Sequence, residues 1–348
     1  MSICLCNLSA DVALELLAKN KEEPEAAEPL LESFSCDPDE AKTLLGDFME
    51  SLPQPVELLV DSASKRREAE EFACHVHRGA VPPGAFLKVR EEIYVTSPEY
   101  TLLQQANQLH QASLCQMLGR YLGVWMPDKE SGTGQDERAP LTTLEQLDGF
   151  LRNAGSARGL RNLRLAMNYT CEGAASRPET SLQLALSLPP ELRGLWLPQP
   201  IMNYEVDLSE HAQRLCGRKT IRIDLCWPHA SFGLEYQGKD HERTMGADYA
   251  RWFAAREAGY ELWLVAHEQL SSAFQMDHIG REVAKRLGVA IDESLWPSND
   301  ELQGLLDTLA GHKHPKLLGR DELRKLKRKY RGYQRRTQLL AQTHDDKI

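Results

Sequence analysis

The order of apolar segments between residues 176 and 290 constrains the fold of this chain more than any other feature. Short runs rich in apolar and β-branched residues are typical of buried strands, and longer apolar segments that follow Ser and Pro are typical of helices. The pattern predicts helix, strand, strand, strand, helix and strand over residues 178–188, 200–208, 220–227, 232–237, 244–258 and 260–266. We therefore expect an α/β domain with an αβββαβ core in this part of the chain.

The two middle strands of this segment can be set in register. A four-residue turn, Pro228–Ser231, separates Trp227 from Phe232, so counting outwards sets Asp224 opposite Glu235. Residues two apart on a strand share a face, and this face therefore also carries Arg222 and Gln237. The opposite face is predicted to be apolar, with Ile221, Ile223, Leu225, Leu234 and Tyr236.

Two carboxylates that face each other across a sheet repel unless something neutralises them. Mg²⁺ prefers oxygen ligands and often takes one or two protein carboxylates together with waters and a substrate phosphate. Asp224 and Glu235, with a backbone carbonyl near Tyr236, are therefore predicted to hold Mg²⁺ or Mn²⁺. A cation held in this way polarises a phosphodiester and activates a water that attacks it.

These residues carry a family resemblance that covers about residues 176–290. The pattern resembles the PD-(D/E)xK nuclease superfamily, and within it the branch of very-short-patch-repair endonucleases. The matching elements are Arg222-Ile-Asp224, Glu235-Tyr-Gln237-Gly238, His241, Asp248-xx-Arg251, Gly259 and the strand Leu262–Val265. The resemblance implies a restriction-endonuclease-like core.

The resemblance also implies residue roles. Asp224 and Glu235 take the places of the metal-binding carboxylates, and Glu179 takes that of the first-helix acid that often completes the catalytic and metal site. Gln237 stands where the superfamily usually has lysine, so it could orient a water but could not supply a positive charge. Lys239 is an alternative source of that charge. His241 and Arg251 would contact nucleic-acid phosphate, and Asp248 would be structural.

The part before residue 128 is predicted to be an α+β domain. Strands are expected over residues 55–60, 72–76, 85–89 and 93–95, followed by a helix that Ser97 caps and that continues, with or without a break, to Leu122. This part resembles bacterial abortive-infection antitoxin-type proteins. The resemblance is carried by the first of these strands, His75, His77, Pro82-Pro-Gly84 and Tyr94–Glu99. It implies a regulatory or DNA-binding region.

Four regions follow from these patterns. We expect the α+β domain at 1–127, a linker and helical connector at 128–175, the nuclease-like domain at 176–292 and a basic helical tail at 293–348. Within the connector, residues 128–140 are polar and read as a loop, and helices are expected over 143–151 and 159–169. The acidic, proline-containing stretch 22–40 is expected to be a solvated loop or a loosely held helix.

Charge is distributed unevenly along the chain. The net charge is −10, yet residues 312–336 hold eleven Lys and Arg against two acidic residues and so carry +9. Local clusters of this kind bind polyanions in a salt-dependent manner. The predicted nucleic-acid contacts in the tail are Lys325, Arg328, Lys329, Arg331 and Arg335. The alternative is a solubilising tail or an intramolecular partner of residues 22–40.

Eight dispersed cysteines without a CxxC pair argue against a zinc site or a disulfide framework, so they are expected to be reduced thiols that lie mostly in the core. No apolar run approaches the ~20 residues that span a bilayer. Residues 1–17 contain no Lys or Arg that could form the n-region of a signal peptide. These features predict a cytoplasmic protein.

Two functions fit these predictions. The first is a Mg²⁺-dependent DNA endonuclease in bacterial defence or DNA repair, with Asp224, Glu235 and Glu179 as ligands and Gln237 orienting the water. The second is a nuclease-fold protein without catalysis that binds DNA as a regulator, or binds a cognate toxin as an antitoxin of an abortive-infection system. The glutamine at position 237 is what motivates the second.

Overall fold

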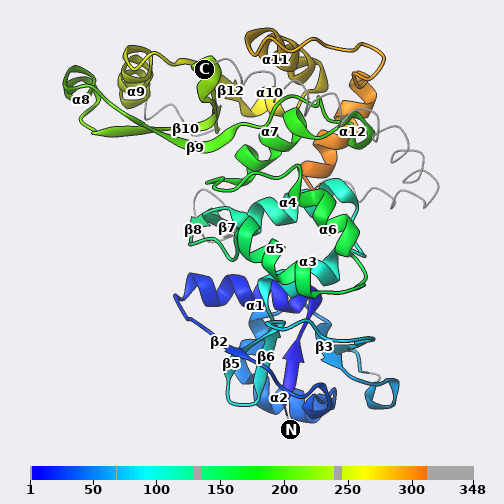
Figure 1. The fold of residues 1–348 in the computed structure, drawn as a ribbon. Coiled ribbons are helices and arrows are strands. Elements are labelled where there is room, and N and C mark those ends of the chain that lie inside the picture. The colour runs from blue at the N-terminus through cyan, green and yellow to red at the C-terminus, as the bar shows by residue number, and fades with distance from the viewer. Residues whose placement is uncertain (1, 68, 128–134, 239–244, 312–348) are drawn as a thin grey trace.

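The computed structural model describes residues 2–67, 69–127, 135–238 and 245–311. It is a mixed α/β protein whose elements form three successive zones (Figure 1). A six-stranded sheet with its helices occupies the N-terminal end, a group of helices lies in the middle, and a four-stranded sheet with further helices occupies the C-terminal end. Within the described residues, no helix is both long and apolar enough to cross a membrane.

The N-terminal sheet has the strand order β2-β5-β6-β1-β3-β4 and mixes parallel with antiparallel neighbours. The predicted strands are confirmed as β3 (Val56–Val60), β4 (Phe72–Val76), β5 (Phe86–Arg90) and β6 (Ile93–Thr96). Its central strand β1 (Ile3–Leu5) and helix α1 (Asn7–Lys19) were not predicted. All three residues of β1 are fully buried, so this short strand becomes recognisable only through its neighbours.

The acidic stretch is more ordered than expected. It contains strand β2 (Glu25–Ala27), which pairs with β5, a 3₁₀ turn at Leu31–Ser33, and the start of helix α2 (Pro38–Leu45). Asp37 caps α2 by accepting hydrogen bonds from the backbone N–H groups of Asp39 and Glu40. The prediction of a solvated loop or a loosely held helix is therefore wrong at β2, which is a paired strand, whereas the start of α2 is helical.

The middle zone follows the predicted helical pattern closely. Ser97 caps α3 (Pro98–Gln105), and after a break the chain continues as α4 (Gln111–Leu122). The connector forms α5 (Leu144–Asn153), with a capping box at Thr143, and α6 (Leu160–Met167). The predicted loop 128–140 is wrong at its end, because β8 (Gln135–Glu137) pairs with β7 (Trp125–Pro127).

The C-terminal sheet has the order β12-β11-β10-β9, and helix α7 (Arg177–Ser187) precedes it in the chain. The predicted strands are confirmed as β9 (Ile201–Asp207), β10 (Thr220–Trp227), β11 (Phe232–Gln237) and β12 (Glu261–Ala266). β9, β10 and β11 run antiparallel, whereas β12 is parallel to β11 and follows helix α9 (Met245–Glu257). An unpredicted helix, α8 (Glu210–Cys216), joins β9 to β10.

Three more helices follow the sheet: α10 (His267–Leu270), α11 (Ala273–Arg286) and α12 (Asn299–Leu309). Helix α12 belongs to the segment predicted as a basic tail, yet its first turn is acidic and four of its leucines are buried in the core. The eleven Lys and Arg of residues 312–336 lie outside the described residues.

Two hydrophobic clusters hold the fold together. The larger one is continuous from Ile3 in the first strand to Leu309 in α12. The smaller one joins the outer parts of β9 and β10 to α8 and α9. Strand β10 contributes to both, because Ile221 and Ile223 lie in the small cluster and Leu225 in the large one. The single apolar face predicted for this strand is therefore divided, and Asp224 lies at the division.

One disulfide joins Cys36 to Cys74, whose Cα atoms are 6.2 Å apart. The expectation that all eight cysteines are reduced is therefore wrong for this pair. The other six are free, and four of these are buried, which fits their prediction as core thiols.

Candidate active site

The predicted register of β10 and β11 is confirmed by the structure. Trp227 pairs with Phe232 and Leu225 with Leu234, and extending this register by one residue, beyond the end of the ladder, sets Asp224 opposite Glu235. The backbone pairing of the two strands ends before this pair, and a side-chain hydrogen bond follows it. Asp224 Oδ2 accepts a hydrogen bond of 2.8 Å from the backbone N–H of Tyr236. Asp224 thus fixes the point at which the two strands separate.

Glu179 in the first turn of α7 lies beside this pair, as predicted. It is buried, and both its carboxylate oxygens accept hydrogen bonds. Oε1 accepts from the Ser176 hydroxyl at 2.8 Å, and Oε2 accepts from the Ala175 N–H and from Asn203 Nδ2, each at 2.8 Å. Glu179 therefore caps its own helix and ties that helix to β9.

Arg251 on α9 brings the only positive charge that contacts the pair among the described residues. Its guanidinium donates to Glu235 Oε2 and to the backbone carbonyl of Arg222, the latter at 2.9 Å. The same Nη2 lies 3.9 Å from Asp224 Oδ1. The predicted phosphate-binding arginine thus lies directly between the two carboxylates.

One arginine does not balance three carboxylates, of which Glu179 and Glu235 are buried and Asp224 is partly buried. Burial, together with the charges of Glu235 and Glu179, raises the pKa of Asp224 well above its usual value. Burial also raises the pKa of Glu179 and of Glu235, although hydrogen bonds oppose the rise at Glu179 and Arg251 opposes it at Glu235. The site therefore carries excess negative charge, which favours a proton or a cation.

One oxygen of this site has no partner. Glu235 Oε1 is buried and has no hydrogen bond in the described part of the chain. A buried polar atom without a partner is costly and is often explained by a ligand or ion that completes the site. In the arrangement seen here, with Arg251 bonded to Glu235, the described residues contain no group of three His, Cys, Asp or Glu side chains disposed to hold a metal.

A pocket of about 500 Å³ opens beside Asp224. Its lining includes Asn203, Arg251 and three exposed cations that the sequence analysis did not select as nucleic-acid contacts: Arg218, Lys219 and Arg222. Cations beside a carboxylate site can hold a phosphate backbone. The Arg218-Lys219 pair directly before β10 is the sequence signal that points to this role.

Asn203 is a further residue without a signal in the sequence. It lies within β9 with a positive φ of 46°, a conformation that Asn tolerates better than most residues. It lies where the β9–β10 pairing passes Asp224, and its side chain donates to Glu179 and to the Gly173 carbonyl at 2.8 and 2.9 Å. Asn203 thereby connects Glu179 to the strand next to Asp224.

The remaining predicted site residues fall into two groups. Gln237 is partly buried at the end of β11, where its side chain makes no hydrogen bond to any described residue. Lys239, His241 and the tail contacts lie outside the described residues, and Asp248 is placed in α9 without a described side chain. The predicted tail contacts concerned are Lys325, Arg328, Lys329, Arg331 and Arg335.

No family model matches this chain, and searches of curated proteins and of solved structures found no significant match.

Proposed function

We propose that the C-terminal sheet is the core of a restriction-endonuclease-like domain that hydrolyses DNA phosphodiesters with a divalent cation. The observation that carries the proposal is the carboxylate pair Asp224 and Glu235. The two side chains lie on adjacent strands, Glu235 buried and Asp224 partly buried, have raised pKa values, and include an oxygen without a partner among the described residues, Glu235 Oε1. The strand order β12-β11-β10-β9, with helix α9 before the last strand, supports the same fold.

The residues present fit a hard cation such as Mg²⁺ or Mn²⁺. Asp224 and Glu235 are the ligands we assign, because Mg²⁺ needs only one or two protein carboxylates and completes its shell with water and substrate oxygens. Such a cation would polarise the phosphate and lower the pKa of a bound water. Glu179 already accepts three hydrogen bonds, so its part is to add negative charge and to position β9 through Asn203.

Arg251 has two roles in this proposal. Without a cation it neutralises Glu235, and on substrate binding its guanidinium can turn to a phosphate, which it binds through two parallel N–H groups. The exposed cations Arg218, Lys219 and Arg222 line the adjacent pocket and would hold the strand of nucleic acid. Gln237 would orient the attacking water by hydrogen bonding.

A second function is favoured by two specific observations. Gln237 supplies no positive charge near the scissile phosphate, and Arg251 is bonded directly to one of the two carboxylates. Both fit a protein in which the nuclease fold is retained for DNA binding by a regulator, or for an antitoxin that binds a toxin. In that case Arg251 is a permanent structural partner of Glu235.

Cleavage assays with the full chain distinguish the two functions. Supercoiled plasmid and labelled single- and double-stranded oligonucleotides are incubated with Mg²⁺ or Mn²⁺ and with the natural protein, Asp224→Ala, Glu235→Ala or Asp207→Ala. Asp207 is an exposed carboxylate on the neighbouring strand β9 and serves as the matched control. We expect the two site variants to lose at least ~100-fold in rate, because a metal ligand is removed, and the control to retain activity.

Cleavage that survives in Asp224→Ala would contradict the proposed site. If no protein cleaves any substrate under either ion, while all four bind DNA with the same salt dependence, the hydrolytic proposal fails and the regulator function is supported. Gln237→Lys sharpens the choice: a nuclease that needs more positive charge should gain rate, whereas a binding protein should show no cleavage at all.

A further inference from the structure

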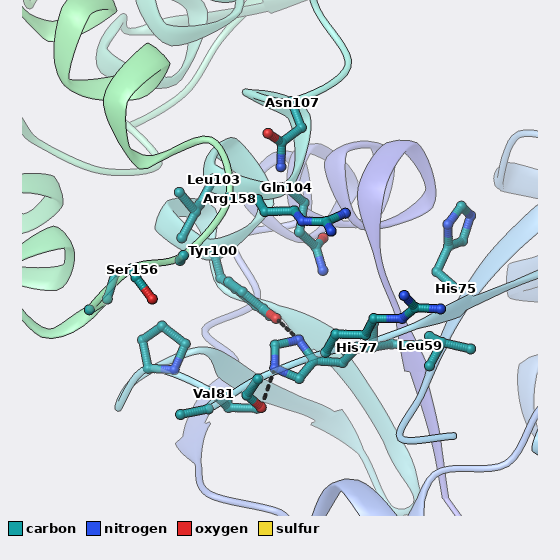
Figure 2. A pocket seen from close by; sticks show the side chains of 18 of the residues that line it. Leu59, His75, His77, Val81, Tyr100, Leu103, Gln104, Asn107, Ser156 and Arg158 are labelled. Atoms are coloured by element: carbon teal, nitrogen blue, oxygen red, sulfur yellow. Dashed lines mark hydrogen bonds between the residues drawn. The ribbon is translucent and has the colours of Figure 1, made fainter. Parts of the chain in front are cut away.

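A second and larger cavity, of about 960 Å³, lies between the N-terminal sheet and the middle helices. Its wall is assembled from the start of α1, the end of β4 and the loop after it, helix α3 with the turn that follows, and the loop between α5 and α6. Figure 2 shows side chains from these separate segments converging on one space. Pockets of this size at the junction of structural zones commonly bind small molecules.

The charge of this lining differs from that of the chain as a whole. Of 348 residues, 51 are acidic, so a lining of 22 residues drawn at random would contain about three carboxylates. The lining contains none. It contains three arginines, Arg66, Arg78 and Arg158, and two histidines, His75 and His77. A local excess of positive charge in an acidic protein favours an anionic ligand.

The three arginines come from three different loops and are all exposed. None of them forms an ion pair with a carboxylate in the described part of the chain, although the protein has ten more acidic than basic residues. Arg158 reaches toward the centre of the cavity in Figure 2. The guanidinium group matches the geometry of phosphate oxygens and binds them through paired N–H groups.

Beside the arginines the lining is rich in primary amides, which both donate and accept hydrogen bonds. Gln108 Nε2 donates to Asn7 Oδ1 at 3.1 Å, and Gln104 Oε1 accepts from the backbone N–H of Asn7 at 3.1 Å, so Asn7 holds both glutamine side chains in place. Asn107 points into the cavity in Figure 2 and makes no side-chain hydrogen bond to a described residue. Side-chain amides can recognise the edge of a nucleobase with two hydrogen bonds.

The floor of the cavity is fixed by an internal hydrogen-bonded pair. His77 Nε2 donates to the Gly79 carbonyl at 3.0 Å, so in the neutral ring Nδ1 is the acceptor for the Tyr100 hydroxyl, 2.6 Å away (Figure 2). Burial lowers the pKa of His77, which agrees with a neutral ring. Leu103 and Val81 add apolar surface to this wall. The cavity therefore offers an apolar wall, amides and arginines together.

We propose that this cavity binds a free nucleoside phosphate, with its phosphates at Arg78 and Arg158 and its base against the amides. A phosphate alone would leave most of the volume and the amide groups unused. The site is separate from the carboxylate pair of the C-terminal sheet and does not depend on the function proposed for it. It gives the N-terminal part of the chain a ligand of its own.

The test uses isothermal titration calorimetry on the full chain in EDTA, so that the proposed cation site cannot contribute. ATP, GTP, CTP, UTP and pyrophosphate are titrated one at a time. We expect at least one nucleotide to bind saturably and at least tenfold more tightly than pyrophosphate. The double variant that combines Arg78→Ala with Arg158→Ala should bind that nucleotide at least tenfold more weakly. Arg161→Ala, one helical turn away, exposed and outside the lining, should bind as the natural protein does.

Two changes at one exposed position test the charge argument: Asn107→Asp is nearly isosteric, and Asn107→Ala removes the amide without adding charge. Asn107→Asp adds a negative charge to the exposed amide position and should weaken nucleotide binding by at least tenfold, whereas Asn107→Ala should weaken it by less. The proposal is overturned if none of the four nucleotides binds. It is equally overturned if pyrophosphate binds as tightly as the best nucleotide. It is overturned, too, if the double arginine variant binds that nucleotide with the affinity of the natural protein.

Discussion

Two groups of largely buried carboxylates lie in different parts of this molecule, one where α1 meets α4 and the other at the C-terminal sheet (Figure 1), and they are balanced by different numbers of cations. In the N-terminal group, Asp11 and Glu15 on α1 face Arg120 of α4 and Arg138. In the C-terminal group, Glu179, Asp224 and Glu235 share the single cation of Arg251. The first group therefore has equal numbers of positive and negative charges, and the second has two excess negative charges.

The N-terminal group is also saturated with hydrogen bonds. Arg120 Nη2 donates to both oxygens of Asp11 at 2.7 and 2.8 Å, and Tyr121 donates to Asp11 at 2.7 Å. Arg138, whose side chain is fully buried, donates to Glu15 and to the carbonyls of Gly123, Ala139 and Arg120. Burial opposes the charge of Arg120, but Asp11 and Glu15 outweigh it and raise its pKa. A group with every charge paired has nothing left for a ligand.

The C-terminal group differs in two properties that are common at functional sites, namely perturbed pKa values and a buried polar atom without a partner. Its carboxyl pKa values are raised, not lowered, and one buried oxygen is without a partner. Perturbed titration in a cleft is common at sites that bind cations or move protons. The comparison teaches that burial of a carboxylate is not by itself a functional signal, whereas burial without enough compensating charge is one.

The largest effect is expected in the balanced group. Glu15→Ala removes the partner of the fully buried Arg138 and one partner of Arg120, so it should destabilise the protein by about 3–5 kcal/mol. Chemical denaturation followed by circular dichroism measures this loss. Arg152→Ala breaks an exposed ion pair with Asp148 and should cost no more than about 0.5 kcal/mol. Equal effects of the two changes would mean that the N-terminal group is not a structural clamp.

Local sequence patterns predicted most elements of the fold, including the register that brings Asp224 to Glu235. They succeeded where apolar runs are long and capped, as at Ser97 and Thr143. They failed for β1 and β2, which have three residues each and are defined by their partners β6 and β5. A segment so short has no period of its own, so tertiary pairing decides its structure.

In the candidate site, the positions of Asp224 and Glu235 could be predicted from the sequence, but the contacts of Arg251 and Asn203 could not. The carboxylates could be found because strand alternation and a tight turn fix their register. That Arg251 bonds to Glu235, or that Asn203 reaches Glu179, depends on how α9 and β9 pack, which no local pattern encodes. The N-terminal group was missed for the same reason. More than 100 residues separate its two carboxylates, on α1, from its two arginines, on α4 and directly after β8.

A smaller effect is expected when the unbalanced group loses its only cation. Arg251→Ala should destabilise the protein by about 1.5–3 kcal/mol at pH 8, the range for a charge-assisted hydrogen bond, and by less at pH 5, where carboxyls take up protons. If the proposed cation site exists, 10 mM MgCl₂ should restore part of this loss in thermal melts. Arg214→Ala, on exposed α8, should show neither effect. A variant that Mg²⁺ does not stabilise would count against the cation site.

The smallest effect separates the two groups by its sign. The pKa of Asp224 is raised by burial and by Glu235 and Glu179, so from pH 4 upwards the folded protein retains a proton that the unfolded chain releases. Rising pH therefore favours unfolding through this residue, up to the pKa of the folded state.

Asp224→Asn removes this cost while its amide oxygen can still accept from the backbone N–H of Tyr236. The variant should therefore stabilise the protein by on the order of 1 kcal/mol at pH 8 and by almost nothing at pH 4. Asp11→Asn should instead destabilise at pH 8, because it weakens the bonds from Arg120 and Tyr121. Melting temperatures of both variants across pH 4–8 measure the difference, and a stability loss in Asp224→Asn as large as that in Asp11→Asn would place both groups in the same structural class.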